Sequence, residues 1–215
     1  MNEDSVLLVD KPAGITSFGV VARVRRRLSE QLGKKAKVGH TGTLDPFATG
    51  LMIIVTGKEC RNAMNYSKLD KEYEATIRLG QTSTTGDPEG ELTDVSDVEP
   101  SKEAVEAALE RFRGEITQRP PIFSAIKING RRAYDLARKG EAVEIPERQV
   151  TIFTLELLDY TYPNVRIRTH VSSGTYIRSL AEDIGTVLET GAYCSELRRT
   201  KVGEWSVVGA EAIQA

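Results

Sequence analysis

The sequence has little of what several classes of protein depend on. It contains two cysteines, Cys60 and Cys194, which lie far apart and form no C-x-x-C pair, and two isolated histidines, His40 and His170. These residues argue against a structural zinc site and against a disulfide framework. No apolar run approaches the ~18 residues of a membrane helix, and the acidic first four residues lack the basic region of a signal peptide. We therefore expect a cytoplasmic protein without metal and without membrane contact.

Length and composition indicate a globular fold. The chain has 215 residues, of which 40% are apolar and 28% are charged, so it can bury a sizeable core. At roughly 150 residues per domain, this length predicts one large domain, which we place over residues 1–215.

Charge is unevenly distributed along the chain, although the net charge is only −2. The window Gly86 to Glu110 carries −8, so the rest of the chain carries +6. Bases outnumber acids seven to one in Arg23 to Lys37 and eight to two in Arg111 to Lys139. Affinity for phosphates depends on the local field rather than on the net charge, so these basic stretches are compatible with an RNA partner. The simpler interpretation is that they form a solvated helix face.

Hydrophobic periodicity predicts an α+β fold. Helices are expected from Ser17, the predicted N-cap, to Gly33, from Ser101 to Gly114, and over about Tyr176 to Glu189. Several segments have the pattern of strands, with Asn129-Gly130 as a hairpin turn. They are Ser5–Asp10, Leu51–Val55, Tyr73–Leu79, Ile122–Ile128, Gln149–Tyr160, Val165–Val171 and Glu196–Val202. The excess of strands and their hairpin spacing favour a mixed, mostly antiparallel central sheet flanked by helices.

The segment Gly39 to Gly50 is the most informative one for chemistry. Its glycines permit tight turns and the close approach of a ligand, and Pro46 keeps Asp45 out of a helix. A carboxylate on such a loop beside a buried strand can act as a nucleophile or a base, or it can simply form a turn. The phosphate-binding motif G-x-x-x-x-G-K-[ST] is absent.

A second segment, Ser172 to Leu180, places Arg178 in the first turn of a predicted helix. A buried guanidinium there needs a carboxylate partner, and Asp45 is one candidate, whereas an exposed arginine needs none. Tyr73 and Tyr176 can stack on a base or can be ordinary core residues with a wet hydroxyl group.

Six motifs, in order along nearly the whole chain, resemble those of the TruB-type tRNA pseudouridine-55 synthases. Each is weak alone, but the ordered set is specific. The family patterns that match are K-P-x-G-x-T-S at Lys11–Ser17, G-H-x-G-x-L-D-P-x-A-x-G at Gly39–Gly50, K-x-Y-x-A at Lys71–Ala75, the P-P-x-x-S-A-x-K-x-x-G stretch within Gly114–Gly130, Gly174–Arg178 and Leu197–Thr200.

The resemblance implies a pseudouridine-synthase-like catalytic domain that acts on tRNA. The reaction it implies is the isomerisation of a uridine in the T-loop, at tRNA position 55, by a monomeric enzyme that uses no cofactor and no metal. The target base must first be flipped out of the folded loop.

The resemblance also implies a role for each site residue. Asp45 is the nucleophile, Arg178 keeps it ionised, and Tyr73 lies on the flipped uracil, where its hydroxyl can move a proton. The predicted substrate-binding residues are His40, Tyr73, Tyr176, Leu197 and Lys11. Whether Asp45 attacks the ribose or the base stays open.

Family members usually continue into a small RNA-binding domain of the PUA type, and we expect none in these 215 residues. Two alternatives remain. The chain can be a non-catalytic RNA-binding or tRNA-folding module, or a pseudouridine synthase that acts on another RNA.

Overall fold

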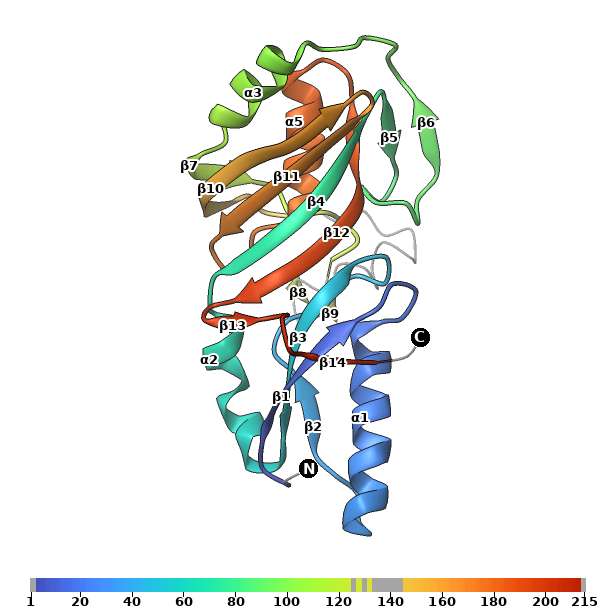
Figure 1. Ribbon diagram of the computed structural model, residues 1–215, viewed down its shortest axis with the longest axis vertical. Coiled ribbons are helices and arrows are strands. Elements are labelled where there is room, and N and C mark those ends of the chain that lie inside the picture. Colours follow the sequence, from blue (N-terminus) through green and yellow to red (C-terminus); the bar gives the residue numbers. More distant parts are fainter. Residues whose placement is uncertain (1–2, 125–126, 129–130, 133–144, 214–215) are drawn as a thin grey trace. The chain divides into compact units, whose positions relative to one another are not determined.

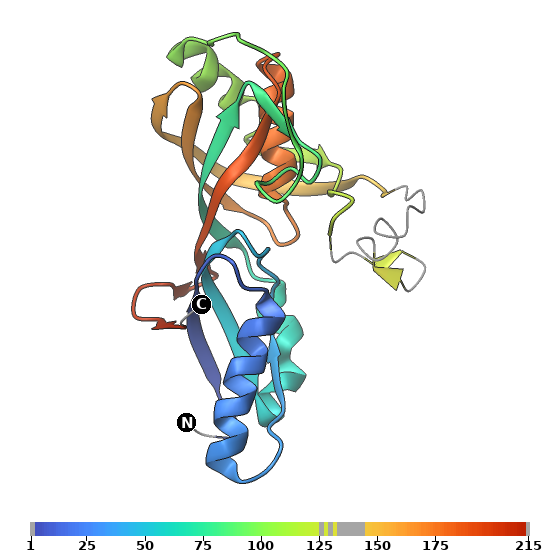
Figure 2. The same cartoon turned by 90° about the vertical axis from the view of Figure 1, so that its right-hand side faces the viewer.

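The computed structural model describes residues 3–124, 127–128, 131–132 and 145–213, and it divides into two compact units (Figures 1 and 2). The first unit comprises Met1–Tyr73 and Arg198–Ala215, and the second comprises Glu74–Leu197. Strands β4 (Lys71–Leu79) and β12 (Ala192–Val202) contribute residues to both units.

The first unit is built around β3 (Thr49–Thr56), which is buried along almost its whole length. Strands β1 (Val6–Lys11) and β2 (Val38–His40) pair with β3 antiparallel, and the last part of β12 pairs with it parallel. The short β14 (Glu211–Ala212) is parallel to β1, and β13 (Trp205–Ser206) pairs with β12.

Helix α1 (Ser17–Leu32) lies beside these strands (Figure 1). It buries Val20, Val21, Val24 and Leu28, which form one apolar stripe along the helix. Alternate residues of β3 form a second cluster, Leu51, Ile53 and Val55, against side chains of the 3₁₀ helix η1 (Gly57–Asn62) and α2 (Ala63–Ser67). Because β3 is covered on both faces, it has the continuous apolar run of a buried strand.

In the second unit, the strand order is β12-β4-β11-β10-β7, with β7 at Gly114–Gln118, β10 at Arg148–Thr161 and β11 at Asn164–Val171. The pairs β10–β11 and β10–β7 are antiparallel. Helix α5 (Ile177–Val187) lies behind this sheet in Figure 1, and α3 (Lys102–Glu110) begins at the N-cap Ser101. Two small hairpins complete the described elements: β5 (Gln81–Ser83) with β6 (Leu92–Asp94), and β8 (Lys127–Ile128) with β9 (Arg131–Arg132).

The predicted fold class, α+β with a mixed and mostly antiparallel sheet, is confirmed. Two local predictions were wrong. Thr16, not Ser17, caps α1, because its side chain accepts from the Gly19 amide. The strand expected from Ile122 shows irregular backbone over 122–124, and strand structure starts only at Lys127. The turn Asn129-Gly130 lies outside the described residues, although the strands on either side of it pair as a hairpin. Helices η1 and α2 were not predicted.

Candidate active site

The loop between β2 and β3 carries Asp45. Asp45 is half-buried, and its backbone carbonyl accepts a hydrogen bond of 3.1 Å from the Ala48 amide. Pro46 follows directly, and Asp45 lies outside any helix, as the sequence predicts. The carboxylate thus lies on irregular backbone at the entrance to the buried strand β3.

Lys11 holds the backbone of this loop by hydrogen bonds. Its side chain is fully buried, and its ammonium donates to the carbonyls of Pro12 and Ile15 at 2.8 Å and of Pro46 at 3.1 Å. The Gly14 amide donates to the same Pro46 carbonyl at 2.9 Å. Lys11 therefore joins the residue after Asp45 to the turn before α1, and its predicted contact with substrate stays a prediction.

Ser17 provides a second attachment on the other side of Asp45. Its hydroxyl donates to the Leu44 carbonyl and accepts from the Leu44 amide, both at 2.8 Å. This reciprocal pair connects the loop to the first residue of α1. The residues before and after Asp45 are therefore both held by buried polar groups, which restricts the positions open to the carboxylate.

His40 and Tyr73 are the other predicted site residues of the first unit. His40 ends β2, immediately before the loop, and is half-buried. Tyr73 lies on β4 and is 8% exposed, so much of its ring is covered by protein. Its neighbour Lys71 is also buried and donates to the carbonyls of Ser67 and Leu69. Burial, assisted by the charge of Arg199, lowers the pKa of Lys71 to about 8.

In the second unit, Arg178 lies in the first turn of α5 with 3% of its surface exposed. Its guanidinium donates to the Thr85 carbonyl at 2.7 Å, to the Phe123 carbonyl at 2.8 Å and to Asp87 Oδ2 at 3.1 Å. The buried alternative predicted for Arg178 is thus confirmed. Asp87 supplies a carboxylate within this unit, a pairing that the sequence analysis did not propose.

Asp87 is held as firmly as its partner. It is 3% exposed, and its Oδ1 accepts from the Thr85 hydroxyl at 2.6 Å and from the Glu89 amide at 3.0 Å. Glu182, one turn after Arg178, is mostly buried, and this burial raises its pKa although the charge of Arg178 opposes the rise. Two backbone carbonyls and the Asp87 carboxylate therefore fix the direction of the Arg178 guanidinium.

Tyr176 immediately precedes α5. The Gln118 side chain accepts from its amide at 2.8 Å and donates to its carbonyl at 3.0 Å. The Arg148 guanidinium lies 4.9 Å from the centre of its ring, in cation–π contact. Leu197, the last residue of the second unit, is 9% exposed. The seven predicted site residues therefore divide between the units: Lys11, His40, Asp45 and Tyr73 in the first, and Tyr176, Arg178 and Leu197 in the second.

No helix of the described residues is both long enough and apolar enough to span a membrane.

The fold is that of a pseudouridine synthase. Two solved structures each match 95% of the chain. A chain of a Cbf5–Nop10–Gar1 complex is 31% identical, with a TM-score of 0.71 and 50% of that chain covered. A chain of an H/ACA RNP bound to a substrate RNA containing 2′-deoxyuridine is 29% identical, with a TM-score of 0.67 and 49% of that chain covered. Residues 26–177 match the TruB family pseudouridylate synthase N-terminal domain, and residues 178–213 match the tRNA pseudouridylate synthase B C-terminal domain. The chain belongs to the TruB family of pseudouridylate synthases.

Curated relatives agree with this assignment. The tRNA pseudouridine synthase B of Phocaeicola vulgatus is 50% identical over 204 residues, which are 94% of this chain and 87% of the relative. The protein of the same name from Burkholderia lata is 49% identical over 212 residues, but the chain spans only 64% of its length.

Proposed function

We propose that this protein converts one uridine in the T-loop of tRNA, at tRNA position 55, into pseudouridine. The observation that carries the proposal is the loop with Asp45, which has the family's motif and is anchored on both sides by Lys11 and Ser17. The names of the relatives, tRNA pseudouridine synthase B, support tRNA as the substrate.

The reaction is an isomerisation, so its atoms balance without a co-reactant. The bond between C1′ and N1 of uracil breaks, the ring rotates, and a bond forms between C1′ and C5. The proton leaves C5, and N1 gains one. Asp45 attacks the nucleotide or assists departure of uracil, and the Tyr73 hydroxyl can move the proton from C5. This proton transfer is general base catalysis.

Binding must offset the cost of flipping the base out of its stack, which is a few kcal/mol. Tyr73 stacks on the flipped uracil, and Tyr176 and Leu197 line the pocket. His40 stacks in the RNA loop where bases are displaced. Arg178 keeps Asp45 ionised, since a nearby positive charge lowers the pKa of a carboxyl group.

Basic residues of the first unit supply a surface for the RNA backbone. A hollow of about 430 Å³ is lined by Arg25, Lys35, Ala36, Lys37 and Val38, and its three bases belong to the basic stretch Arg23 to Lys37. Phosphate contacts of this kind give affinity without sequence selectivity.

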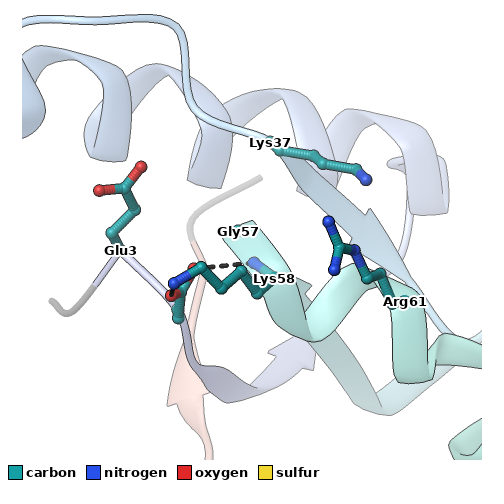
Figure 3. Close-up of a pocket in the computed structure, with 6 residues that line it drawn as sticks. Glu3, Lys37, Gly57, Lys58 and Arg61 are labelled. Carbon is teal, nitrogen blue, oxygen red and sulfur yellow. Dashed lines mark hydrogen bonds and ion pairs between the residues drawn. The ribbon is translucent and has the colours of Figure 1, made fainter.

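A second hollow, of about 280 Å³, adjoins the first through Lys37, and its lining includes Lys58 and Arg61 (Figure 3). Figure 3 shows the charged ends of Lys37 and Arg61 turned toward each other. Asp4 lies 3.6 Å from the Lys58 ammonium, so one of these bases is partly neutralised.

We further propose that the enzyme works in the cytoplasm as a monomer, without a metal or a cofactor, and that residues 1–215 form a pseudouridine synthase catalytic domain.

The test is to incubate the protein with unmodified tRNA transcript and to map pseudouridine along the product. We expect modification at position 55 and none in a transcript with cytidine there. Tight binding without any pseudouridine would favour the non-catalytic module. Modification of another RNA in preference to tRNA would favour the second alternative.

A further inference from the structure

The guanidinium of Arg199 is buried against the backbone of the loop that carries Asp45. Arg199 is 2% exposed. It donates from Nε to the Leu51 carbonyl at 2.7 Å, from Nη2 to the Gly42 carbonyl at 3.1 Å and from Nη1 to the Thr43 carbonyl at 3.4 Å. One side chain therefore binds the loop before Asp45 and strand β3 after it.

The backbone of Arg199 lies in close contact with strand β3. It pairs with Gly50 in the parallel ladder of β12 and β3. Gly50 has φ +104°, and a Cβ there would lie 2.3 Å from the Arg199 carbonyl oxygen. Only glycine permits this approach, so the position of the Arg199 side chain is set by both strands.

The charge of Arg199 is not explained by an ion pair. Within the described part of the chain no carboxylate lies in salt-bridge distance of it, and its charge lowers the pKa of the nearby buried Lys71. A buried cation without a counter-charge costs stability, and a second buried cation adds to that cost. The partners of the buried guanidinium are instead the three backbone carbonyls of Gly42, Thr43 and Leu51.

We propose that Arg199 is a positioning residue for the proposed reaction: its planar fork holds the loop at Gly42 and Thr43 so that Asp45 is presented in a fixed place. The proposal rests on the proposed function. A lysine keeps the charge, but its ammonium is one compact donor group and cannot reproduce the separate Nε, Nη1 and Nη2 donors that reach these three carbonyls. The loop of an Arg199→Lys variant should therefore be looser, although the charge is unchanged.

The matched control is Arg198→Lys, at the adjacent position of the same strand. The Arg198 guanidinium donates to the Asp10 carboxylate at 3.1 and 2.7 Å and to the Thr49 hydroxyl at 3.4 Å, so this variant also keeps the charge and loses a guanidinium fork. Two readouts are needed. Hydrogen exchange over residues 41–48 reports the loop without requiring activity, and the single-turnover rate of pseudouridine formation reports the positioning of Asp45.

We expect Arg199→Lys to exchange faster over residues 41–48 alone and to lose about 100-fold in single-turnover rate per folded molecule, with tRNA affinity within threefold of wild type. Arg198→Lys should match wild type in both readouts. Unchanged exchange over the loop, faster exchange throughout the chain, or a loss that falls on tRNA affinity would each overturn the proposal. If wild-type protein forms no pseudouridine, the proposed function fails, while the exchange measurement still decides whether Arg199 holds the loop.

Discussion

Asp45 is the residue on which the proposed chemistry depends. Asp45→Asn is nearly isosteric but removes the nucleophilic carboxylate, so pseudouridine formation should be abolished while tRNA affinity and the fold are retained. The loss belongs to the chemical step, and single-turnover kinetics with saturating protein measure it. A purified variant that keeps a tenth of the wild-type rate would contradict the assignment.

Tyr73 combines a buried ring with a hydroxyl group, and substitution can separate the two. Tyr73→Phe keeps the ring, so product formation should fall while tRNA binding changes little. Tyr73→Leu should reduce both, since stacking on an aromatic ring is worth ~1–3 kcal/mol per base. An unaltered single-turnover rate in the Phe variant would remove the proton-transfer role and leave stacking only.

Lys71 predicts a pH dependence of stability. Its pKa is about 8 in the folded protein and 10.5 in the reference state, so the folded chain binds fewer protons between these values. The free energy of unfolding should therefore rise with pH across this window, by up to about 1.4 kcal/mol per pH unit from this group. Below pH 8 the cost of burying the charged ammonium is fully present.

The comparison for Lys71 is Lys71→Met, which cannot titrate. Chemical denaturation of both proteins between pH 7 and pH 10.5 isolates the contribution of this side chain. The difference in unfolding free energy, wild type minus variant, should increase steadily with pH. A difference that stays constant would show that Lys71 titrates normally.

At the scale of elements, helix α5 depends on the absence of a side chain at Gly185. A Cβ there would lie 2.4 Å from the Ala192 amide nitrogen, at the start of β12. Gly185→Ala should therefore destabilise the protein by roughly 1–3 kcal/mol through overpacking. Gly19→Ala in α1 is the control, since its Cβ would meet nothing closer than 3.4 Å. That variant should be neutral or more stable by up to about 1 kcal/mol, as judged by urea denaturation.

Sequence patterns predicted the long elements well. Strand β3 and helices α1, α3 and α5 lie where the sequence patterns placed them, to within a few residues at their ends. Helices η1 and α2 were missed because their side chains that pack against β3 are only partly buried, so the apolar pattern of their sequence is weak. Asp45 and Arg178 were selected as candidates through motifs. No local sequence signal links Arg178 to Asp87, which lies 91 positions earlier. The contacts of Arg199 could not be predicted either, because its partners are backbone carbonyls, which carry no sequence signal.

At the scale of the whole molecule, the uneven charge predicts how salt affects binding. Lys35→Gln with Lys37→Gln should weaken tRNA binding and reduce the slope of log affinity against log salt by about 0.7–0.9 per lost phosphate contact. Glu103, Glu106 and Glu110 on α3 should face away from phosphates, so replacing them with Gln should leave affinity the same or higher. Titrations at several salt concentrations test both sets. An unaltered slope in the lysine variant, or much weaker binding in the glutamine variant, would show that the RNA lies elsewhere.

The division of the first unit between Met1–Tyr73 and Arg198–Ala215 has a consequence for biosynthesis. A ribosome makes Asp45 and its loop early, but it must translate all of residues 74–197 before Arg199 can reach the Gly42 carbonyl or β14 can pair with β1. Domains usually fold during synthesis in order from the N-terminus. Here the second unit can fold while the first is still incomplete, so the loop that carries Asp45 acquires its guanidinium anchor only when the final strands emerge.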